Sequence, residues 1–181
     1  LFLKMKGLEK IPSLAVLAKL RTVFAQDGSV TAGNSSQMSD AAAAVLVASE
    51  EAVEKYNLTP KAEFLGFSVA GVPAEIMGIG PVKAVPKVLD SLDLSLDDIG
   101  WIELNEAFAA QSLAVIQELK LDPEKVNPLG GAIALGHPLG ATGAIRIATL
   151  VSAMQREKID YGMVTMCIGT GMGAAGIIKR C

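Results

Sequence analysis

From residue 41 to its end, the chain alternates short apolar runs with amphipathic segments, and this alternation limits the folds open to it more than any other feature. The apolar runs are bounded by turn-forming or polar residues and predict strands at Ala41–Ser49, Phe64–Gly71, Trp101–Leu104, Tyr161–Ile168 and Gly173–Lys179. The amphipathic segments predict helices at Glu50–Tyr56, Pro81–Leu89, Ala107–Leu119 and Ala141–Glu157. Helices and strands in this alternation are typical of an α/β domain built in layers.

The segments before residue 50 are less regular. Residues 1–26 are mixed basic and apolar, with apolar side chains at helical spacing, and residues 27–40 form a polar loop. For residues 41–49 the local signals conflict. Ser39-Asp40 before four alanines is typical of a capped helix, and only Val-Leu-Val indicates a buried strand. Propensity alone favours a helix there.

Composition excludes several classes of protein. Hydrophobic residues make up 51% of the 181 residues but aromatic residues only 4%. We therefore expect the chain to bury a large apolar face against the rest of a larger protein or against a partner. No apolar run reaches the roughly 18 residues that a membrane-spanning helix requires, so we expect no membrane contact. The net charge of −3 argues against nucleic acid as a partner.

Cysteine and histidine are scarce. Two cysteines do not form the disulfide framework of a secreted domain, so we expect reduced thiols and an intracellular compartment. A single histidine argues against a multi-histidine site, and no metal is predicted. The first residues carry neither a secretory signal nor an initiating methionine, so we expect that upstream sequence has been lost.

Three segments carry side chains suited to catalysis. His137, the only histidine, lies among five glycines in residues 127–143, and such glycine density lets a backbone approach a ligand closely. Cys167 ends an apolar strand and is followed by three alternating glycines, and Asn105 stands where a strand turns into a helix. Each has an ordinary alternative: a surface histidine, a buried structural cysteine and a helix cap. Together they indicate thiol and acyl chemistry.

The glycine-rich segments do not predict nucleotide binding. No Gly-Lys-Ser/Thr follows His137, which excludes a P-loop. The glycines after Cys167 lead into an apolar strand and then the end of the sequence, so no helix is left to hold a pyrophosphate.

Four motifs in one order make the chain resemble the thiolase family. They are Thr31-Ala-Gly-Asn-Ser-Ser36, Asn105-Glu-Ala-Phe108, Gly136-His-Pro-Leu-Gly140 and Cys167-Ile-Gly-Thr-Gly171. Their intervals also resemble the family's, and the match extends over essentially the whole chain. The sequence around them, for example Met77-Gly-Ile-Gly-Pro81, is more similar to degradative 3-ketoacyl-CoA thiolases than to biosynthetic acetoacetyl-CoA thiolases.

The resemblance implies a layered α-β-α-β-α enzyme with two similar halves and a loop insertion in the first half. Residues 1–36 would be the end of that CoA-facing insertion, and residues 37–181 the carboxy-terminal thiolase domain. That domain would hold a mixed five-stranded sheet packed with helices. Residues 41–49 would then be a buried strand, against their local propensity.

Catalytic roles also follow from the resemblance. His137 resembles the residue that activates the nucleophile and donates to the thioester oxygen, and Asn105 resembles the residue that holds a water beside it. Cys167 resembles the acid/base acting on the acetyl-CoA α-carbon, and the Gly169 amide a donor of the second oxyanion hole. The positions that resemble substrate-binding residues are Gly33, Ser36, Met77 and Phe108.

The resemblance implies a substrate and partners as well. CoA and acyl-CoA would be substrates, and no cofactor would stay bound. The family's nucleophilic cysteine lies in the first half and has no counterpart here, so we expect this chain alone to be inactive. Its partners would be the missing amino-terminal half and further copies in a homodimer or tetramer. The location would be cytoplasmic in a bacterium, and peroxisomal or mitochondrial in a eukaryote.

The chain departs from the family at three positions outside the reacting centre. Ala41 stands where glycine is common, which would crowd the backbone. Thr22 replaces a frequent proline in the CoA-facing loop. Ile145 occupies the place of a usual arginine, with Arg146 one position away.

Other functions stay open at this level. The enzyme could be of the biosynthetic acetoacetyl-CoA type, or the domain could bind acyl-CoA or a partner protein without turnover. A serine hydrolase is a further alternative, because Ser68 in Gly-Phe-Ser-Val-Ala, Asp97 or Asp98, and His137 follow in the order those enzymes use. Against it, Pro73 interrupts the place where a helix would have to start.

Overall fold

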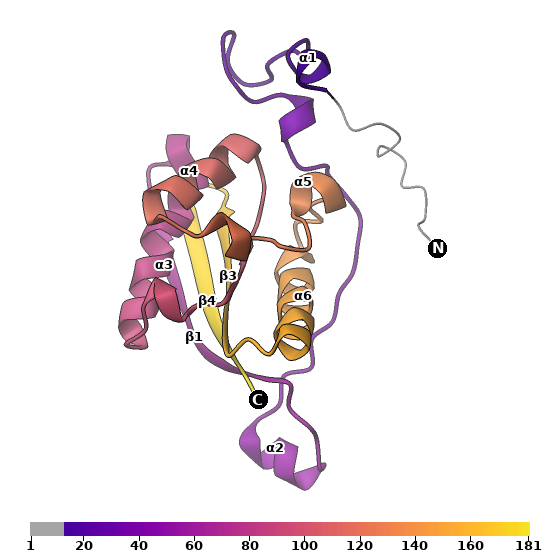
Figure 1. The fold of residues 1–181 in the computed structure, drawn as a ribbon, viewed down its shortest axis with the longest axis vertical. Coiled ribbons are helices and arrows are strands. Elements are labelled where there is room, and N and C mark those ends of the chain that lie inside the picture. The colour runs from indigo at the N-terminus through magenta and orange to yellow at the C-terminus, as the bar shows by residue number, and fades with distance from the viewer. Residues whose placement is uncertain (1–12) are drawn as a thin grey trace.

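The computed structural model describes residues 13–181, and its centre is a mixed sheet of four strands (Figure 1). In chain order the strands are β1 (Ala62–Gly71), β2 (Trp101–Leu104), β3 (Tyr161–Ile168) and β4 (Met172–Arg180). Their spatial order is β1-β4-β3-β2, with β2 parallel to β3 and β4 antiparallel to both of its neighbours. Because β2 and β3 run in the same direction, their carboxyl ends meet at one edge of the sheet.

Helices cover both faces of this sheet. α3 (Gly80–Ser91) and α4 (Ala109–Leu119) lie on one side, and α6 (Thr142–Glu157) lies on the other (Figure 1). The other helical pieces are short: α1 (Leu14–Leu17), α2 (Glu50–Lys55), α5 (Ala132–Leu135) and the 3-10 turns η1 (Ala32–Asn34), η2 (Ala74–Ile79), η3 (Leu96–Asp98) and η4 (Pro123–Lys125). The larger apolar cluster includes Val85, Leu104 and Ile177, and a smaller one includes Leu150 and Met154 of α6.

Four of the five predicted strands and all four predicted helices are confirmed, with boundaries within about two residues. All of these elements except α2 bury residues within the chain, so their local pattern and their environment agree. α4 begins later than predicted because Phe108 is extended, with φ −143° and ψ 145°. In the part of the chain that the structure describes, none of the helices is long and apolar enough to cross a membrane.

The fifth predicted strand is wrong. Residues 41–49 form neither a strand nor a helix, and they run as an exposed coil outside α6 on their way to α2 (Figure 1). Leu46 and Val47 are 83% and 85% exposed. A strand forms through hydrogen bonds to a neighbouring strand, and none of the four strands among residues 13–181 pairs with this segment. The sheet therefore has four strands instead of five, and a single parallel bridge joins Val126 to Ile102 beside it.

The amino end of α3 touches the sheet backbone to backbone. A side chain on Gly80 would overlap the backbone of Met172 and Gly173, and one on Gly173 would overlap Gly80. Glycine at both positions allows this approach. Gly173 is the register partner of Cys167, so the contact lies beside that cysteine.

The first described residues form little regular structure. α1 spans four residues and buries none of them, and the Val16 amide donates to the side chain of Ser13 at its start. The helical spacing predicted for residues 1–26 thus yields one turn, and the part of that prediction that falls on residues 1–12 lies outside the described residues. Phe24 nevertheless reaches the main body, where its ring meets that of Phe108 edge to face with centroids 5.6 Å apart.

Candidate active site

The carboxyl ends of β2 and β3 carry two of the predicted catalytic residues. Asn105 directly follows β2, and its backbone N–H donates to Thr165 O of β3 at 2.9 Å. Cys167 lies two residues beyond Thr165 along β3. The loop between α5 and α6 brings His137 to this edge, where His137 Nε2 lies 3.3 Å from Asn105 Nδ2. Residues far apart in the sequence therefore converge at one edge of the sheet.

The imidazole of His137 is held on both sides. Nδ1 lies 2.7 Å from Thr142 Oγ1, whose own hydroxyl donates to Pro138 O at 3.0 Å. Because the threonine proton is used in that bond, Thr142 Oγ1 accepts from Nδ1–H, and Nε2 of the neutral ring keeps its lone pair. The backbone amide of His137 donates to Gln37 O at 2.9 Å. The ring therefore presents a basic nitrogen beside Asn105.

The environment lowers the pKa of His137 and raises the pKa of Cys167. Burial lowers the pKa of His137, and the charge of the Arg146 guanidinium lowers it further. The ring is therefore neutral at pH 7 and can accept a proton. Burial raises the pKa of the Cys167 thiol, and a backbone hydrogen bond offsets part of that rise. The sulfur is therefore a protonated thiol near neutrality, suited to donating a proton.

The side chain of Asn105 is buried and has an unused acceptor. Its Nδ2 contacts His137, but Oδ1 has no hydrogen-bond partner within residues 13–181. Leaving a buried amide oxygen unpaired costs about 1–3 kcal/mol, so such an atom in a native fold calls for an explanation. A water or a substrate group bound beside the imidazole would satisfy it.

Cys167 is half-buried and leaves the sheet on the face away from Asn105. Its register partner Gly173 packs against Gly80 at the start of α3, and directly paired residues project to the same face. Asn105 points instead toward the His137 loop beside α6. Cys167 and His137 thus lie at one edge of the sheet, and the structure gives no hydrogen bond between them.

Gly169 lies in the exposed turn between β3 and β4. The turn continues through Thr170 and Gly171, whose φ angles of 70° and 95° are in the left-handed region. Glycine adopts such angles readily, but threonine is strained there. The turn therefore keeps a tight, irregular backbone next to Cys167, and Gly169 itself is exposed.

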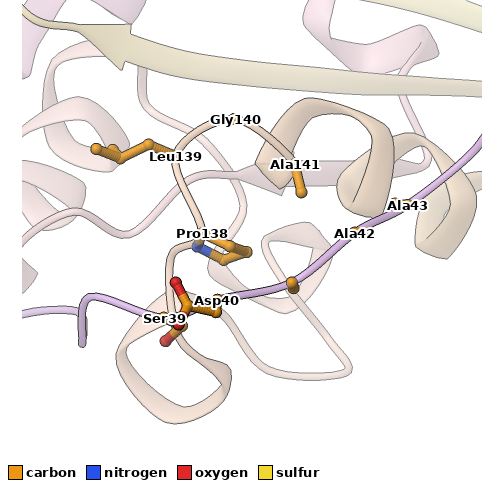
Figure 2. A pocket seen from close by; sticks show the side chains of 9 residues that line it. Ser39, Asp40, Ala42, Ala43, Pro138, Leu139, Gly140 and Ala141 are labelled. Carbon is orange, nitrogen blue, oxygen red and sulfur yellow. The ribbon is translucent and has the colours of Figure 1, made fainter.

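Residues 35–39 form a strap that joins the first part of the chain to the site. The Ser36 amide donates to Ala107 O at 3.0 Å, and Ser35 forms a bridge to Phe108. Met38 forms a parallel bridge to His137. Residues 39–43 then run beside the loop 138–141 that follows the histidine (Figure 2). Ser36 and Phe108, both predicted to bind substrate, are thus neighbours.

The other two predicted substrate-binding residues lie on separate elements. Gly33 is exposed in η1, and a side chain there would overlap the ends of Leu17 and Leu20. Met77 lies in η2, which packs against α4. Their roles in binding stay predictions.

Sequence reasoning missed the groups that support the histidine. Thr142 is the first residue of α6 but does not cap it, because its hydroxyl bonds to Pro138 O and contacts the imidazole, and no helix-start signal indicates that role. The sequence also does not indicate the buried ion pair between Arg146 and Glu103, whose Nη1 and Oε2 lie 3.0 Å apart, because no local pattern links residues 43 positions apart.

Two other kinds of site lack support. Ser68 is buried on β1 and donates to Ala84 O at 2.6 Å, while Asp98 accepts from Ser95. The serine hydrolase alternative is therefore wrong, because its serine is committed to a backbone oxygen and not to His137. In the described part of the chain, no three His, Cys, Asp or Glu side chains gather closely enough to hold a metal ion.

Comparison with known families and proteins agrees with this geometry. A family model described as "Thiolase, C-terminal domain" matches residues 58–180, and one described as "Thiolase, N-terminal domain" matches residues 5–51. The chain is 52% identical over 176 residues to a 3-ketoacyl-CoA thiolase of Bacillus subtilis, covering 97% of this chain and 45% of that protein. It is 49% identical over 175 residues to a human peroxisomal 3-ketoacyl-CoA thiolase, covering 96% and 41%.

Solved structures are similar over the same span. The human mitochondrial 3-ketoacyl-CoA thiolase in complex with CoA has a TM-score of 0.87 at 46% identity, covering 93% of this chain and 43% of that one. The dimeric peroxisomal thiolase of Saccharomyces cerevisiae has a TM-score of 0.82 at 48% identity, covering 91% and 41%. The chain spans less than half the length of these relatives. Residues 41–49 lie in the stretch similar to the amino-terminal domain.

Proposed function

This chain belongs to the thiolase family, and on that premise we propose that it supplies the carboxy-terminal part of the active site of a 3-ketoacyl-CoA thiolase. The whole enzyme would cleave a 3-ketoacyl-CoA with CoA to acetyl-CoA and a shortened acyl-CoA, or catalyse the reverse Claisen condensation. The observation that carries the proposal is the neutral His137, fixed between Thr142 and Asn105 at the sheet edge where the Cys167 thiol also lies.

The protonation states suit each step of the cleavage. His137 Nε2 takes the thiol proton of a nucleophilic cysteine supplied by the amino-terminal half, and the thiolate attacks the 3-keto carbon. The bond between C2 and C3 breaks, its electrons form the acetyl-CoA enolate, and Cys167 Sγ–H donates its proton to C2. CoA then attacks the acyl-enzyme as its thiol proton passes to the Cys167 thiolate, and the released thiolate of the nucleophilic cysteine takes its proton back from His137.

Oxygen charge that develops during these steps requires fixed donors. Once protonated, His137 Nε2–H would donate to the thioester oxygen, and a water on Asn105 Oδ1 would complete that oxyanion hole. The amide of Gly169 would serve the acyl-enzyme. In comparable enzymes each such donor is worth about 3–4 kcal/mol of transition-state stabilisation.

Substrate binding and domain organisation are also proposals. Ser36 and Phe108, adjacent through the strap, would contact the pantetheine arm together with Gly33 and Met77. Residues 1–36 would end the loop insertion, and residues 37–181 would form the carboxy-terminal domain. The family matches divide the chain later, between residues 51 and 58, so residues 37–57 are the part that a structure of the whole enzyme would assign.

The whole enzyme would use CoA as a substrate and hold no cofactor. A solved relative is described in complex with CoA and another as dimeric, which supports CoA binding and association of copies as a homodimer, with a tetramer as the alternative. The relatives include a bacterial and a peroxisomal protein, so the enzyme would be cytoplasmic in a bacterium and peroxisomal or mitochondrial in a eukaryote.

A fusion tests the proposal. The part of the Bacillus subtilis thiolase that precedes the matched segment would be joined to residues 1–181, giving what we call the joined protein. We expect it to cleave 3-ketoacyl-CoA in the presence of CoA, whereas the 181-residue chain alone does not. Acetoacetyl-CoA as a second substrate distinguishes the biosynthetic type. A folded joined protein that binds acyl-CoA without cleaving it would favour the non-catalytic alternative.

A further inference from the structure

A buried ion pair lies next to the catalytic residues without touching them. Glu103 on β2 and Arg146 on α6 have side chains that are 0% and 4% exposed, and Nη1 lies 3.0 Å from Oε2. The other carboxylate oxygen, Oε1, accepts from Trp101 Nε1 at 2.8 Å. The pair therefore joins the strand that ends at Asn105 to the helix that begins at Thr142.

The spacing along each element places the pair directly below the His137 contacts. Glu103 and Asn105 are two residues apart on one strand path, so their side chains project to the same side. Thr142 and Arg146 are four residues apart and share one face of α6. Strand and helix thus meet in two successive layers, one through His137 and one through the ion pair.

Arg146 also hydrogen-bonds to the loop that carries His137. The same Nη1 donates to Gly130 O at 3.3 Å, and Gly130 has a φ of 93° at the turn before α5. The side chain of Asn127 ties the start of this loop to Leu104 through two hydrogen bonds of 2.9 and 2.8 Å. Thr142 holds the other end at the imidazole. The loop is therefore fixed to β2 and α6 on both sides of its histidine.

Stability alone does not require charges here. A buried ion pair can often be replaced by apolar residues of similar volume at no loss, whereas removing one partner leaves an uncompensated charge. Apolar residues cannot, however, donate to Gly130 O or fix the strand and helix at hydrogen-bond distance. A position shift of about 1 Å at a catalytic group can lower a rate by about 10²-fold.

We propose that Glu103 and Arg146 are positioning residues of the thiolase reaction, which hold Asn105 and the His137 loop in register without contacting substrate. This rests on the function proposed above. The guanidinium also contributes to the low pKa of His137, which is consistent with its place beside the loop.

The test compares three variants of the joined protein. Arg146→Met leaves Glu103 unpaired, Glu103→Leu with Arg146→Met removes both charges, and Arg146→Lys keeps the charge but not the planar guanidinium. Thermal unfolding, kcat and KM are measured for each. The His137 ring signal, assigned by its loss in His137→Gln, is followed by NMR with labelled histidine and does not depend on turnover.

We expect the double variant to unfold within a few degrees of the parent, with kcat lower by about 10²-fold, KM within about threefold and a shifted His137 signal. Parental kcat in the double variant would show that the pair is structural and overturn the proposal. If the double variant does not fold, Arg146→Lys decides: lowered kcat with a shifted His137 signal supports positioning, and an unchanged signal overturns it. If the joined protein is inactive altogether, the proposed function fails, and the His137 signal in Arg146→Lys, which keeps the charge, still tests the pair: an unchanged signal overturns positioning.

Discussion

Residues 13–61 and residues 62–180 are both rich in apolar side chains, yet they differ in what those side chains contact. In the first region no described residue is fully buried, and Leu46 and Val47 lie open to solvent. In the second region, helices on both faces of the sheet enclose two apolar clusters. An apolar run therefore predicts burial, but not burial within the same chain. The proposed catalytic residues follow this division, since His137, Asn105 and Cys167 all lie in the second region.

The strap of residues 35–39 is the exception in the first region. It has no core of its own, but it bonds to the backbone of Ala107 and of His137. If the second region carries the reaction and the first only presents substrate, substitutions in the two should act on different kinetic constants. Each of the following predictions uses the joined protein unless another is named.

The largest effect should come from the imidazole. His137→Ala removes the proton acceptor and a later oxyanion donor together, so we expect formation of the acyl-enzyme to slow by about 10²–10⁴-fold. The burst of CoA released from acetyl-CoA measures this step. Ser36→Ala, in the strap, is the matched control and should leave kcat nearly unchanged. A similar loss of kcat in both variants would break the division between the regions.

The second cysteine should fail at a different step. Cys167→Ser should spare acyl transfer to the nucleophile but slow exchange of the acetyl-CoA α-protons by about 10²–10³-fold, because a hydroxyl is a far poorer acid/base here than a thiol. Mass spectrometry of acetyl-CoA in heavy water measures the exchange. Cys181→Ser removes the exposed cysteine and should have no effect. Exchange at the parental rate in Cys167→Ser would refute its acid/base role.

Stability separates the regions directly in the 181-residue chain. Ile177→Ala creates a cavity in the larger core and should lower the free energy of unfolding by about 2–5 kcal/mol. Leu46→Ala, at an exposed site, should change it by less than about 0.5 kcal/mol. Urea denaturation measures both. In the joined protein we expect Leu46→Ala to become destabilising as well, and equal effects in both proteins would mean that this segment has no partner there.

The pH profile of cleavage tests the two protonation states. The proposed reaction needs neutral His137 and protonated Cys167. The pKa of the first is lowered below about 6.5 and that of the second raised above about 8.5. We therefore expect kcat/KM to stay flat between these values, and to fall by up to about tenfold per unit only outside them. A decline that begins between pH 7 and 8 would contradict one assignment.

The smallest effect should come from the aromatic contact between the regions. Phe24→Ala removes an edge-to-face pair with Phe108, worth about 0.5–1.5 kcal/mol, so we expect KM for CoA to rise about two- to tenfold with kcat unchanged. Phe24→Leu keeps part of the apolar surface and should lie between. A fall in kcat instead would place this contact in the chemistry.

The sequence predicted those parts of the fold whose local pattern and environment agree. The strand that ends at Leu104 and the helix that ends at Glu157 follow from periodicity, and the residues around His137 follow from the resemblance to a family. The strand predicted at residues 41–49 did not form because a strand depends on a neighbouring strand, and none of the strands in residues 13–181 pairs with this segment. The sequence also showed that an arginine stands at position 146 and not at 145, but periodicity did not predict what this arginine contacts. Arg146 is buried and forms an ion pair with Glu103, and this contact depends on how α6 packs on the sheet.

The meeting of Gly80 and Gly173 has a consequence for how the protein can vary. Where two side chains touch, a larger residue on one side can often be accommodated by a smaller one on the other, so paired mutations can compensate. Here each glycine meets backbone, and neither has a side chain left to shorten. A second-site suppressor of a substitution at either position is therefore not available from the other. Paired substitutions at Gly80 and Gly173 therefore cannot compensate each other, and any compensation for a change beside Cys167 has to come from other positions.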